Sequence, residues 1–337
     1  MRVVLLVALL ACGVGDVRGA EDGQPAAATD LPAPPASATK PLSREAWWTG
    51  SLLSASAGTM PVGHWLVEPY VVDSHVDAAF DADGHRHEVS SVVRDFTAAY
   101  VMYGLADGVS IGVQPRALLG ARNSGDPSSS AAVGDLTLML QVRLSRSSPG
   151  SWRPATSIVL SETLPTGRYD RLGASAVSAS GAGAHRTDLG FYAQSVGDVL
   201  GSHPLRARLN ATVGWSDHPD VVDLSVYGTP QGFRGHARPG RWVSVDTAFE
   251  FSVSRQWVLA LDLVYQGQAS TIVEGQVGTG SDRIRTTDGT SRAWAVAPAV
   301  EYNFNARFGL IAGYKATLAG RNATADRTGA IALNMVF

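Results

Sequence analysis

Ten ionisable side chains stand within largely apolar stretches of this chain, at positions that alternate with larger apolar residues. They are Glu68, Arg116, Arg143, Arg206, Arg208, Asp246, Glu250, Asp262, Glu301 and Lys315. If these stretches cross a membrane, the charges are costly in lipid and must face water or one another. Two kinds of chemistry stay open. The charges can form a constriction that selects permeating ions, or they can pair with each other and fill a narrow lumen.

Histidines could supply hydrolytic chemistry, as in barrel phospholipases that carry a His and a Ser two residues apart on a strand. None of the eight histidines has Ser at the second following position, and all fall at expected turns, loops or strand ends. Asp217-His218 lies in a long polar stretch and is interpreted as loop polarity rather than a protease pair. We therefore predict no catalytic residue and no enzymatic activity.

Metal ligation is also poorly supported by the spacing of carboxylates and histidines. Asp81-Ala82-Asp83-Gly84 lacks the further carboxylates that a calcium loop requires, so it predicts an Asp-Gly turn. His85 and His87 could hold a metal only with a third ligand, and the sequence offers no convincing one. We predict no metal and no cofactor.

The elements that would position the charged residues are strands, because large apolar residues recur with a period of two. The clearest examples are 136–144, 243–253 and 257–266, each about ten residues long, which is the length of a tilted membrane-crossing strand. The last ten residues follow the same pattern and end on an aromatic residue. Ile331, Leu333, Met335 and Phe337 share one face and are the predicted signal for the barrel-assembly machinery.

Turn residues give the number of strands. Short links are expected near 106–108, 148–150, 201–204, 254–255 and 305–306, and they alternate with long polar stretches near 77–87, 122–133, 166–185, 216–241, 270–290 and 319–327. Such alternation is typical of outer-membrane barrels, with short turns in the periplasm and long loops outside. The fold class predicted is all-β: a transmembrane antiparallel up-and-down barrel of about twelve strands from Gly63 to Phe337, with both termini periplasmic.

Counting from each short turn places four of the charged residues at a similar height near the inner mouth. They are Arg143, Arg208, Glu250 and Glu301, and Arg208 and Glu250 are expected on neighbouring strands.

Tryptophan positions give an independent check, because amphipathic rings concentrate at membrane interfaces. All six tryptophans of the predicted barrel fall at expected strand ends, and we assign them to two aromatic girdles: Trp65, Trp152 and Trp257 on the short-turn side, and Trp215, Trp242 and Trp294 on the long-loop side.

Two segments resist the pattern. Residues 96–105 are apolar on both faces. In 157–164, Glu162 falls on the same face of the expected strand as the apolar residues Ile158 and Leu160. This indicates a bulge or a wrong assignment of the inward and outward faces.

The N-terminal part of the chain looks different from the rest. Residues 1–19 have the layout of a secretory signal peptide with a cut near Gly19, and Cys12 is either part of a lipoprotein acylation box or a chance residue of the signal. Residues 20–42, rich in Ala and Pro, predict a disordered tether. Residues 43–62 include Trp47 and Trp48 and predict a periplasmic segment or one docked in the lumen.

Composition limits the fold classes and the kinds of binding partner that we expect. A net charge of -3 gives no basic field, so nucleic acid is not expected. After the first dozen residues no apolar run reaches the eighteen or so residues of a spanning helix, which excludes a helical membrane protein. A soluble lipocalin-like or sandwich protein remains the alternative fold. The expected partners are outer-membrane lipid, the barrel-assembly machinery and a small-molecule solute, and the oligomeric state stays open.

Short motifs spread over most of residues 45–337 resemble a known family, the outer-membrane barrels identified as transporters of the phenol meta-degradation (MetA) pathway. The motifs are Trp47-Trp48-Thr49-Gly50, Pro61-Val62-Gly63-His64-Trp65, Glu68-Pro69-Tyr70, Tyr103-Gly104-Leu105, Gly134-Asp135-Leu136 and Leu164-Pro165-Thr166-Gly167-Arg168-Tyr169-Asp170. The resemblance implies an outer-membrane location and passive uptake of small, often aromatic or apolar molecules. The competing hypotheses are a sealed structural or adhesive barrel and an outer-membrane hydrolase.

Overall fold

The computed structural model describes residues 46–337 except 124–125, 148–151, 201–202 and 279–282. The predicted signal peptide, Cys12, the tether and residues 43–45 lie outside the described residues. Within the described part of the chain, no helix is long and apolar enough to span a membrane.

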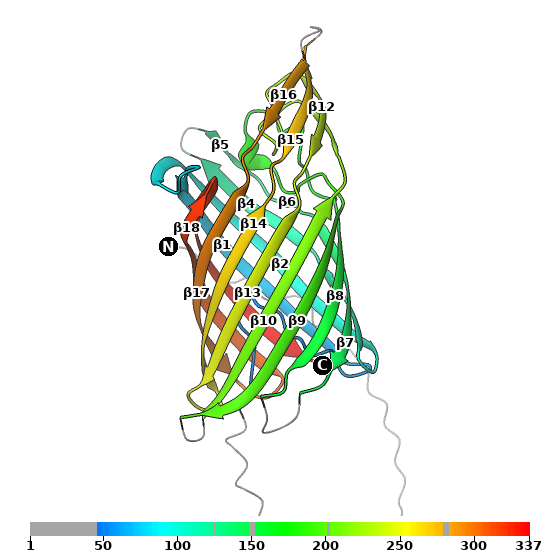
Figure 1. Cartoon of the computed structure of the whole chain (residues 1–337), viewed down its shortest axis with the longest axis vertical. Helices are drawn as coiled ribbons and strands as arrows, with labels where there is room; N and C mark the ends of the chain where they lie inside the picture. The colour runs from blue at the N-terminus through cyan, green and yellow to red at the C-terminus, as the bar shows by residue number, and fades with distance from the viewer. Residues whose placement is uncertain (1–45, 124–125, 148–151, 201–202, 279–282) are drawn as a thin grey trace, which may run out of the picture. The chain divides into compact units, whose positions relative to one another are not determined.

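Antiparallel strands form a closed barrel (Figure 1). The strands of its wall are β1 (Trp65–Phe80), β2 (Arg86–Ala106), β3 (Val109–Gln114) with β4 (Arg116–Asn123), β7 (Leu136–Ser145), β8 (Ala155–Leu164), β9 (Arg186–Val199), β10 (His203–Ser216), β13 (Trp242–Ser252), β14 (Trp257–Gln268), β17 (Ser291–Asn303), β18 (Phe308–Arg321) and β19 (Ala323–Val336). β3 and β4 both pair with β2 and together make one wall strand, interrupted at Pro115, which has no backbone N–H to donate. The wall therefore has twelve strands, as the sequence predicts.

The first and last strands close the barrel. β1 pairs with β2 on one side and with β19 on the other. The backbone N–H of Trp65 donates to the carbonyl oxygen of Phe337 at 3.1 Å, and the N–H of Phe337 donates back to Trp65 at 2.9 Å. Closure removes both sheet edges, so no backbone group of the wall needs a partner in lipid.

Strand alternation sorts the side chains by size and polarity. On β14, Trp257, Leu259, Leu261 and Leu263 are exposed on the outer surface, whereas Val258, Ala260, Asp262 and Val264 are buried inside. β19 follows the same rule: Ile331 and Phe337 are exposed and Ala332 and Asn334 are buried. Large apolar groups face outward and small or polar groups face the lumen, which is the arrangement of a transmembrane barrel.

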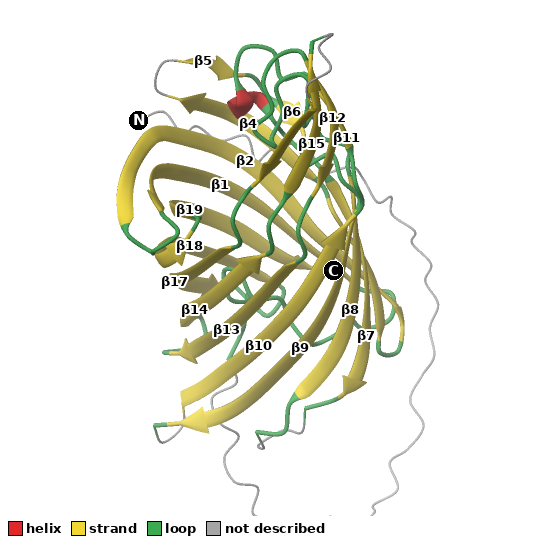
Figure 2. Cartoon of the chain, turned by 45° about the horizontal axis from the view of Figure 1, so that its top comes forward, coloured by secondary structure: helices red, strands yellow, loops and turns green. Residues whose placement is uncertain are grey.

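The two ends of the barrel differ. At one end the links from β2 to β3, β13 to β14 and β17 to β18 are two to four residues long. At the other end, hereafter the long-loop end, the connections carry β5 (Asp126–Ser129), β6 (Ala132–Val133), the 3₁₀ helix η1 (Ala176–Ser178) and a separate four-stranded sheet (Figure 2). That sheet consists of β11 (Asp220–Val222), β12 (Phe233–Arg238), β15 (Ile272–Val277) and β16 (Arg283–Thr287).

The extra sheet was not expected from the sequence, which indicates only polar loops there. Its register continues that of the wall below: Trp242 pairs with Gln268 in the barrel, and Arg238 pairs with Ile272 in the extension. Val221, Phe233, Ala237 and Val273 form its small buried core. Wall strands thus continue beyond the membrane-crossing part because a local apolar cluster supports them.

One expectation about a strand boundary is wrong, and the phase of 157–164, which the sequence left open, is regular apart from a register shift of β7 between Arg143 and Ser145. The predicted long loop 319–327 is instead a tight turn at Asn322, whose φ of 46° lies in the left-handed region that Asn tolerates better than most residues. No bulge interrupts the pairing of β8 with β9, and Glu162 keeps the outward parity of Leu160. It is tolerated because it lies near the long-loop end of β8 and accepts a hydrogen bond from the Thr187 hydroxyl at 2.6 Å.

The facing of residues 96–105, left open by the sequence, is set by the neighbouring strand. Tyr100 pairs with Glu68 and Ala98 with Tyr70, so even-numbered residues of β2 point inward here. Ala98 and Met102 are buried, and Leu105 is exposed on the outside.

Candidate functional site: a plugged lumen and an open vestibule

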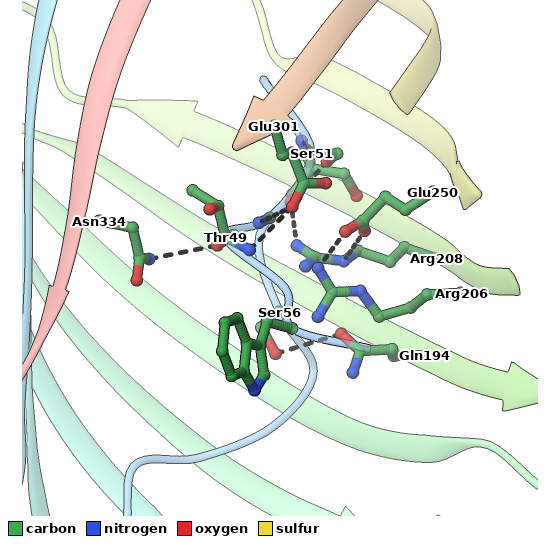
Figure 3. Close-up of polar contacts among 12 residues, drawn as sticks. Thr49, Ser51, Ser56, Gln194, Arg206, Arg208, Glu250, Glu301 and Asn334 are labelled. Atoms are coloured by element: carbon green, nitrogen blue, oxygen red, sulfur yellow. Dashed lines mark hydrogen bonds and ion pairs between the residues drawn. The ribbon is translucent and has the colours of Figure 1, made fainter. Parts of the chain in front are cut away.

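A segment that precedes the first strand lies inside the barrel. We call residues 46–62 the plug. It has no helix and its strand content is a single bridge, between Val62 and Gly104. Instead, its backbone bonds to side chains that point inward from the wall (Figure 3). Buried backbone groups need such partners, so these side chains decide whether the plug can stay in the lumen.

Two carboxylates accept hydrogen bonds from the plug. Glu301 on β17 accepts from the N–H of Thr49 at 2.8 Å and of Gly50 at 3.2 Å. Asp262 on β14 accepts from the N–H of Leu52 at 3.2 Å and of Ser54 at 3.0 Å. A hydrogen bond to a charged group contributes about 1.5–3 kcal/mol.

Donors on the wall hold the carbonyl groups of the plug in the same way. Arg208 Nη1 lies 2.5 Å from the Ser54 carbonyl oxygen, and Asn210 donates to Ala55 at 3.1 Å. Gln141 on β7 donates to the carbonyl oxygen of Ser56 at 2.9 Å. The plug is therefore bonded on both sides of its backbone to strands from different parts of the wall.

Small wall residues make room for the plug. Leu52 is buried against Ala260, Ala297, Ala299, Ile311 and Ala332. A Cβ atom added at Gly309 would lie 1.9 Å from the hydroxyl oxygen of Thr49, and one at Gly313 would lie 2.8 Å from a methyl carbon of Leu52. The wall approaches the plug so closely at these two positions that only glycine fits.

A buried ion cluster lies beside the plug. Glu250 on β13 bonds to Arg206 and, at 2.8 Å, to Arg208, both on β10. Arg206 also stacks on Trp48, with its guanidinium carbon 4.6 Å from the ring centroid. Glu250 is fully buried, so the loss of either cationic partner would leave a costly unpaired charge.

All ten charged residues singled out in the sequence lie on the lumen side of their strands. The structure gathers Arg206, Arg208, Glu250, Asp262 and Glu301 around the plug. Glu68 accepts a hydrogen bond from Asn334 at 2.5 Å. Asp246 is also buried, but among the described residues it makes no hydrogen bond to the plug. We call the wall residues that contact the plug its seat. With the plug in place, these charged residues line the seat rather than an open pore.

The remaining three lie apart from these residues, although Arg143 also bonds to the plug. Arg143, expected at the height of Arg208, instead donates to the Thr59 hydroxyl at 3.1 Å and to Asp107 at 2.7 Å. This hydrogen bond holds the pKa of Asp107, in the turn after β2, below its usual range. Lys315 pairs with Asp326 at 2.9 Å, and Arg116 lies toward the long-loop end.

Five of the six girdle tryptophans are exposed: Trp65, Trp152, Trp215, Trp257 and Trp294. Several stack on neighbours across the strands, for example Trp257 on Tyr302 with centroids 4.7 Å apart. Trp242 is the exception, and its assignment to the girdle is wrong. It has the inward parity of Asp246 and Glu250, and its indole N–H donates to Asp188 at 2.8 Å inside the barrel.

Beyond the plug, toward the long-loop end, the lumen is open. A cavity of about 850 Å³, hereafter the vestibule, is lined by residues of β4, β7, β8, β9, β10, β13, β14, β17 and β19 and of the long connections. Its polar lining includes Arg116, Asp135, Thr137, Thr163, Arg186 and Gln266. The lumen thus has a plugged part and an open part.

The seat of the plug contains residues that sequence reasoning missed, among them Gln141, Asn210, Asn303 and Asn334. They lie at inward positions of predicted strands. Because ionisable side chains were selected from the sequence, these uncharged residues were not identified. A second signal was available: small residues recur at inward positions of 295–313, where Ala297, Ala299 and Gly313 leave space for another segment.

One group of potential metal ligands exists among the described residues, Asp81, Asp83 and His85 in the turn after β1. Asp81 Oδ1 accepts the backbone N–H groups of Asp83 and His85, both at 2.9 Å, and the bond from His85 lowers the pKa of Asp81. These contacts describe a capped turn, as the sequence predicts.

Comparisons with known proteins show a family from the sequence and a fold from one solved structure. The model of a family described as MetA-pathway of phenol degradation matches residues 67–331. Among solved structures, an outer membrane channel from Pseudomonas putida F1 is 20% identical, with a TM-score of 0.62 over 84% of this chain and 99% of that chain. The NanC porin is 8% identical, with a TM-score of 0.41 over 80% of this chain and 98% of that chain. A TodX monoaromatic hydrocarbon channel mutant is 13% identical, with a TM-score of 0.36 over 87% and 94%. The comparison with curated protein sequences found no significant match.

Proposed function

The chain belongs to the MetA-pathway of phenol degradation family, and from this premise we propose that it is an outer-membrane channel for the passive uptake of small molecules, aromatic or apolar compounds among them. The closed twelve-stranded wall with an apolar outer face supports the location. The outer membrane channel from Pseudomonas putida F1 shares this fold, and the proposal includes no catalytic step.

The proposed orientation places the short-turn end in the periplasm and the long-loop end outside. Barrels of this kind are inserted from the periplasm with both termini on that side. The start of β1 and the end of β19 meet at the short-turn end, where Trp65 and Phe337 bond to each other, which supports this orientation. A secretory signal in residues 1–19 and recognition by the barrel-assembly machinery belong to the same proposal.

The observation that carries the proposal is the division of the lumen into vestibule and plug. The vestibule of about 850 Å³ is large enough to hold a small organic molecule. The plug is held by hydrogen bonds and packing and by no disulfide, since Cys12 is the only cysteine of the chain. Passage through the barrel therefore requires the plug to shift, and its contacts set how often it does.

Conductance in planar bilayers tests the proposal. The full-length protein should conduct weakly, and a variant lacking residues 42–56 should conduct several-fold more, because this deletion removes the plug bonds to Glu301, Asp262 and Arg208. The same deletion should speed the entry of radiolabelled aromatic acids or hydrocarbons into proteoliposomes. If both proteins are silent in both assays, the barrel is sealed and the structural or adhesive alternative takes its place.

A further inference from the structure

We propose that the vestibule contains a binding site for the carboxylate group of a small organic acid, formed by Arg116, Thr137, Thr163 and Arg186. This inference rests on the proposed function, because it names the class of solute that the channel would admit. We call these four residues the arginine–threonine row.

Three residues of the row are neighbours on adjacent strands, and Arg116 lies on the next strand of the wall. Thr163 on β8 pairs directly with Thr137 on β7 and with Arg186 on β9. Arg116 begins β4, and its carbonyl oxygen accepts the N–H of Gly134, just before β7, at 2.8 Å. All four side chains line the vestibule, so two guanidinium groups flank two hydroxyl groups on one side of the cavity.

The cations of the row keep free hydrogen-bonding capacity. Arg116 donates only one long bond among the described residues, 3.4 Å to the Gln114 side chain, and makes no ion pair with a described carboxylate. Arg186 uses its Nε atom for Asp188 at 3.2 Å and lies 4.8 Å over the Trp242 ring, which fixes its guanidinium plane. Guanidinium groups bind carboxylates through two parallel N–H bonds, so Arg116 is the principal anchor.

The acidic residues nearby are already occupied by other donors. Asp135 accepts the backbone N–H groups of Gly167 at 2.9 Å and Ala182 at 2.8 Å. Asp188 accepts from Arg186 and from the Trp242 indole. Bonds to these fixed donors hold the two carboxylates at the wall.

The threonines add a donor for a bound oxygen atom. Their Oγ1 atoms are 2.9 Å apart, so one hydroxyl donates to the other. The hydroxyl that accepts this bond still has its own proton to donate, and that proton can reach the vestibule. An anionic oxygen between Arg116 and the threonines would therefore receive both charged and neutral hydrogen bonds.

A neutral hydrocarbon fits this surface less well. Pockets for such ligands are lined mainly by apolar side chains with few polar groups. Here Gln266, Gln268, Ser216, Ser291 and Thr324 also face the vestibule. These groups would lose water without gaining a partner if an apolar molecule covered them.

Binding of [¹⁴C]benzoate to the full-length protein, folded in dodecyl maltoside, tests the site by equilibrium dialysis. We expect saturable binding of benzoate and at least tenfold weaker binding of its neutral analogue benzyl alcohol. Arg116→Gln should weaken benzoate binding about tenfold or more, and Arg116→Lys should restore part of it, because a charge-assisted hydrogen bond is lost in the first and partly kept in the second. Arg241→Gln, at an exposed arginine outside the vestibule lining, is the control and should bind as the unchanged protein does.

Two results would overturn the site: equal affinity for benzoate and benzyl alcohol, or unchanged benzoate affinity in Arg116→Gln. Heat-modifiable migration in gels shows that each variant is folded, so misfolding cannot mimic a loss of binding. Conductance separates this inference from the proposed function. If the barrel lacking residues 42–56 conducts but Arg116→Gln leaves benzoate affinity unchanged, the site alone is refuted. Selective benzoate binding by a barrel that never conducts refutes the channel and keeps the site.

Discussion

Arg208 and Ser54 face each other inside the barrel, with the Arg208 Nη1 atom 2.5 Å from the Ser54 carbonyl oxygen. The same guanidinium forms an ion pair with Glu250, with its Nε atom 2.8 Å from the carboxylate, so one side chain joins the plug to the ion cluster of the wall. Displacement of the plug therefore disturbs a buried charge, and the seat and the plug should respond to mutation together.

Asp262→Asn should loosen the plug. The carboxylate accepts two backbone N–H bonds from the plug, and an amide keeps one neutral acceptor in place of two charged ones. The loss of about 1.5–3 kcal/mol corresponds to roughly a ten- to hundredfold rise in the fraction of open plug. The measurement is single-channel open probability. Asp246→Asn, on the neighbouring strand and without a bond to the plug, should leave it unchanged, and equal effects of both substitutions would argue against the seat described here.

Gly309→Val should expel the plug by steric conflict. A Cβ atom at Gly309 would overlap the Thr49 hydroxyl, whereas one at Gly329 would meet nothing within 4 Å, so Gly329→Ala, which adds a side chain without a conflict, is the control. The readout is the rate of maleimide labelling of Ser54→Cys in a protein that lacks Cys12. Ser54 belongs to the plug and is buried while the plug is in place, so a cysteine there reacts only when the plug moves. Labelling should be at least tenfold faster with Gly309→Val than with Gly329→Ala. Similar slow rates would show that the wall can adapt to a larger residue.

Ion selectivity should depend on the seat charges only after the plug is removed. In the protein lacking residues 42–56, Arg208→Ala should shift the reversal potential toward cations, and Glu301→Ala toward anions, because fixed charges in a narrow pore act on ions with little screening. In the full-length protein both residues are buried and the shifts should be much smaller. Arg143→Ala should favour cations in the same way. A shift of the wrong sign in the truncated protein would refute the charged constriction.

Phe337→Asp should impair assembly rather than transport. Phe337 is exposed on the outer surface and packs edge-on against Phe308, with ring centroids 6.0 Å apart. The amount of heat-modifiable protein in outer-membrane fractions should fall several-fold. Phe304→Asp removes a similarly exposed aromatic ring from the same end of the barrel and is the comparison. If the two substitutions lower folded protein equally, the effect is a general loss of apolar surface and the terminal residue has no special role.

The sequence by itself was enough to determine the barrel, the number of wall strands and the side of each strand on which charges such as Glu250 and Asp262 lie. It could do so because the two-residue period and the turn residues are local properties of the chain. Trp242 shows the limit of position alone, since its place at a strand end suggested a girdle while its parity with Asp246 turns it inward.

Only the tertiary structure decided what occupies the lumen. Thr49 and Glu301 are 252 positions apart, and their contact depends on the closure of the barrel and on small residues such as Gly313 that make room for Leu52. The same holds for the arginine–threonine row, where strand register places Thr163 between Thr137 and Arg186. Such contacts are set by strand register around the whole wall, a long-range property that no local pattern of residues encodes.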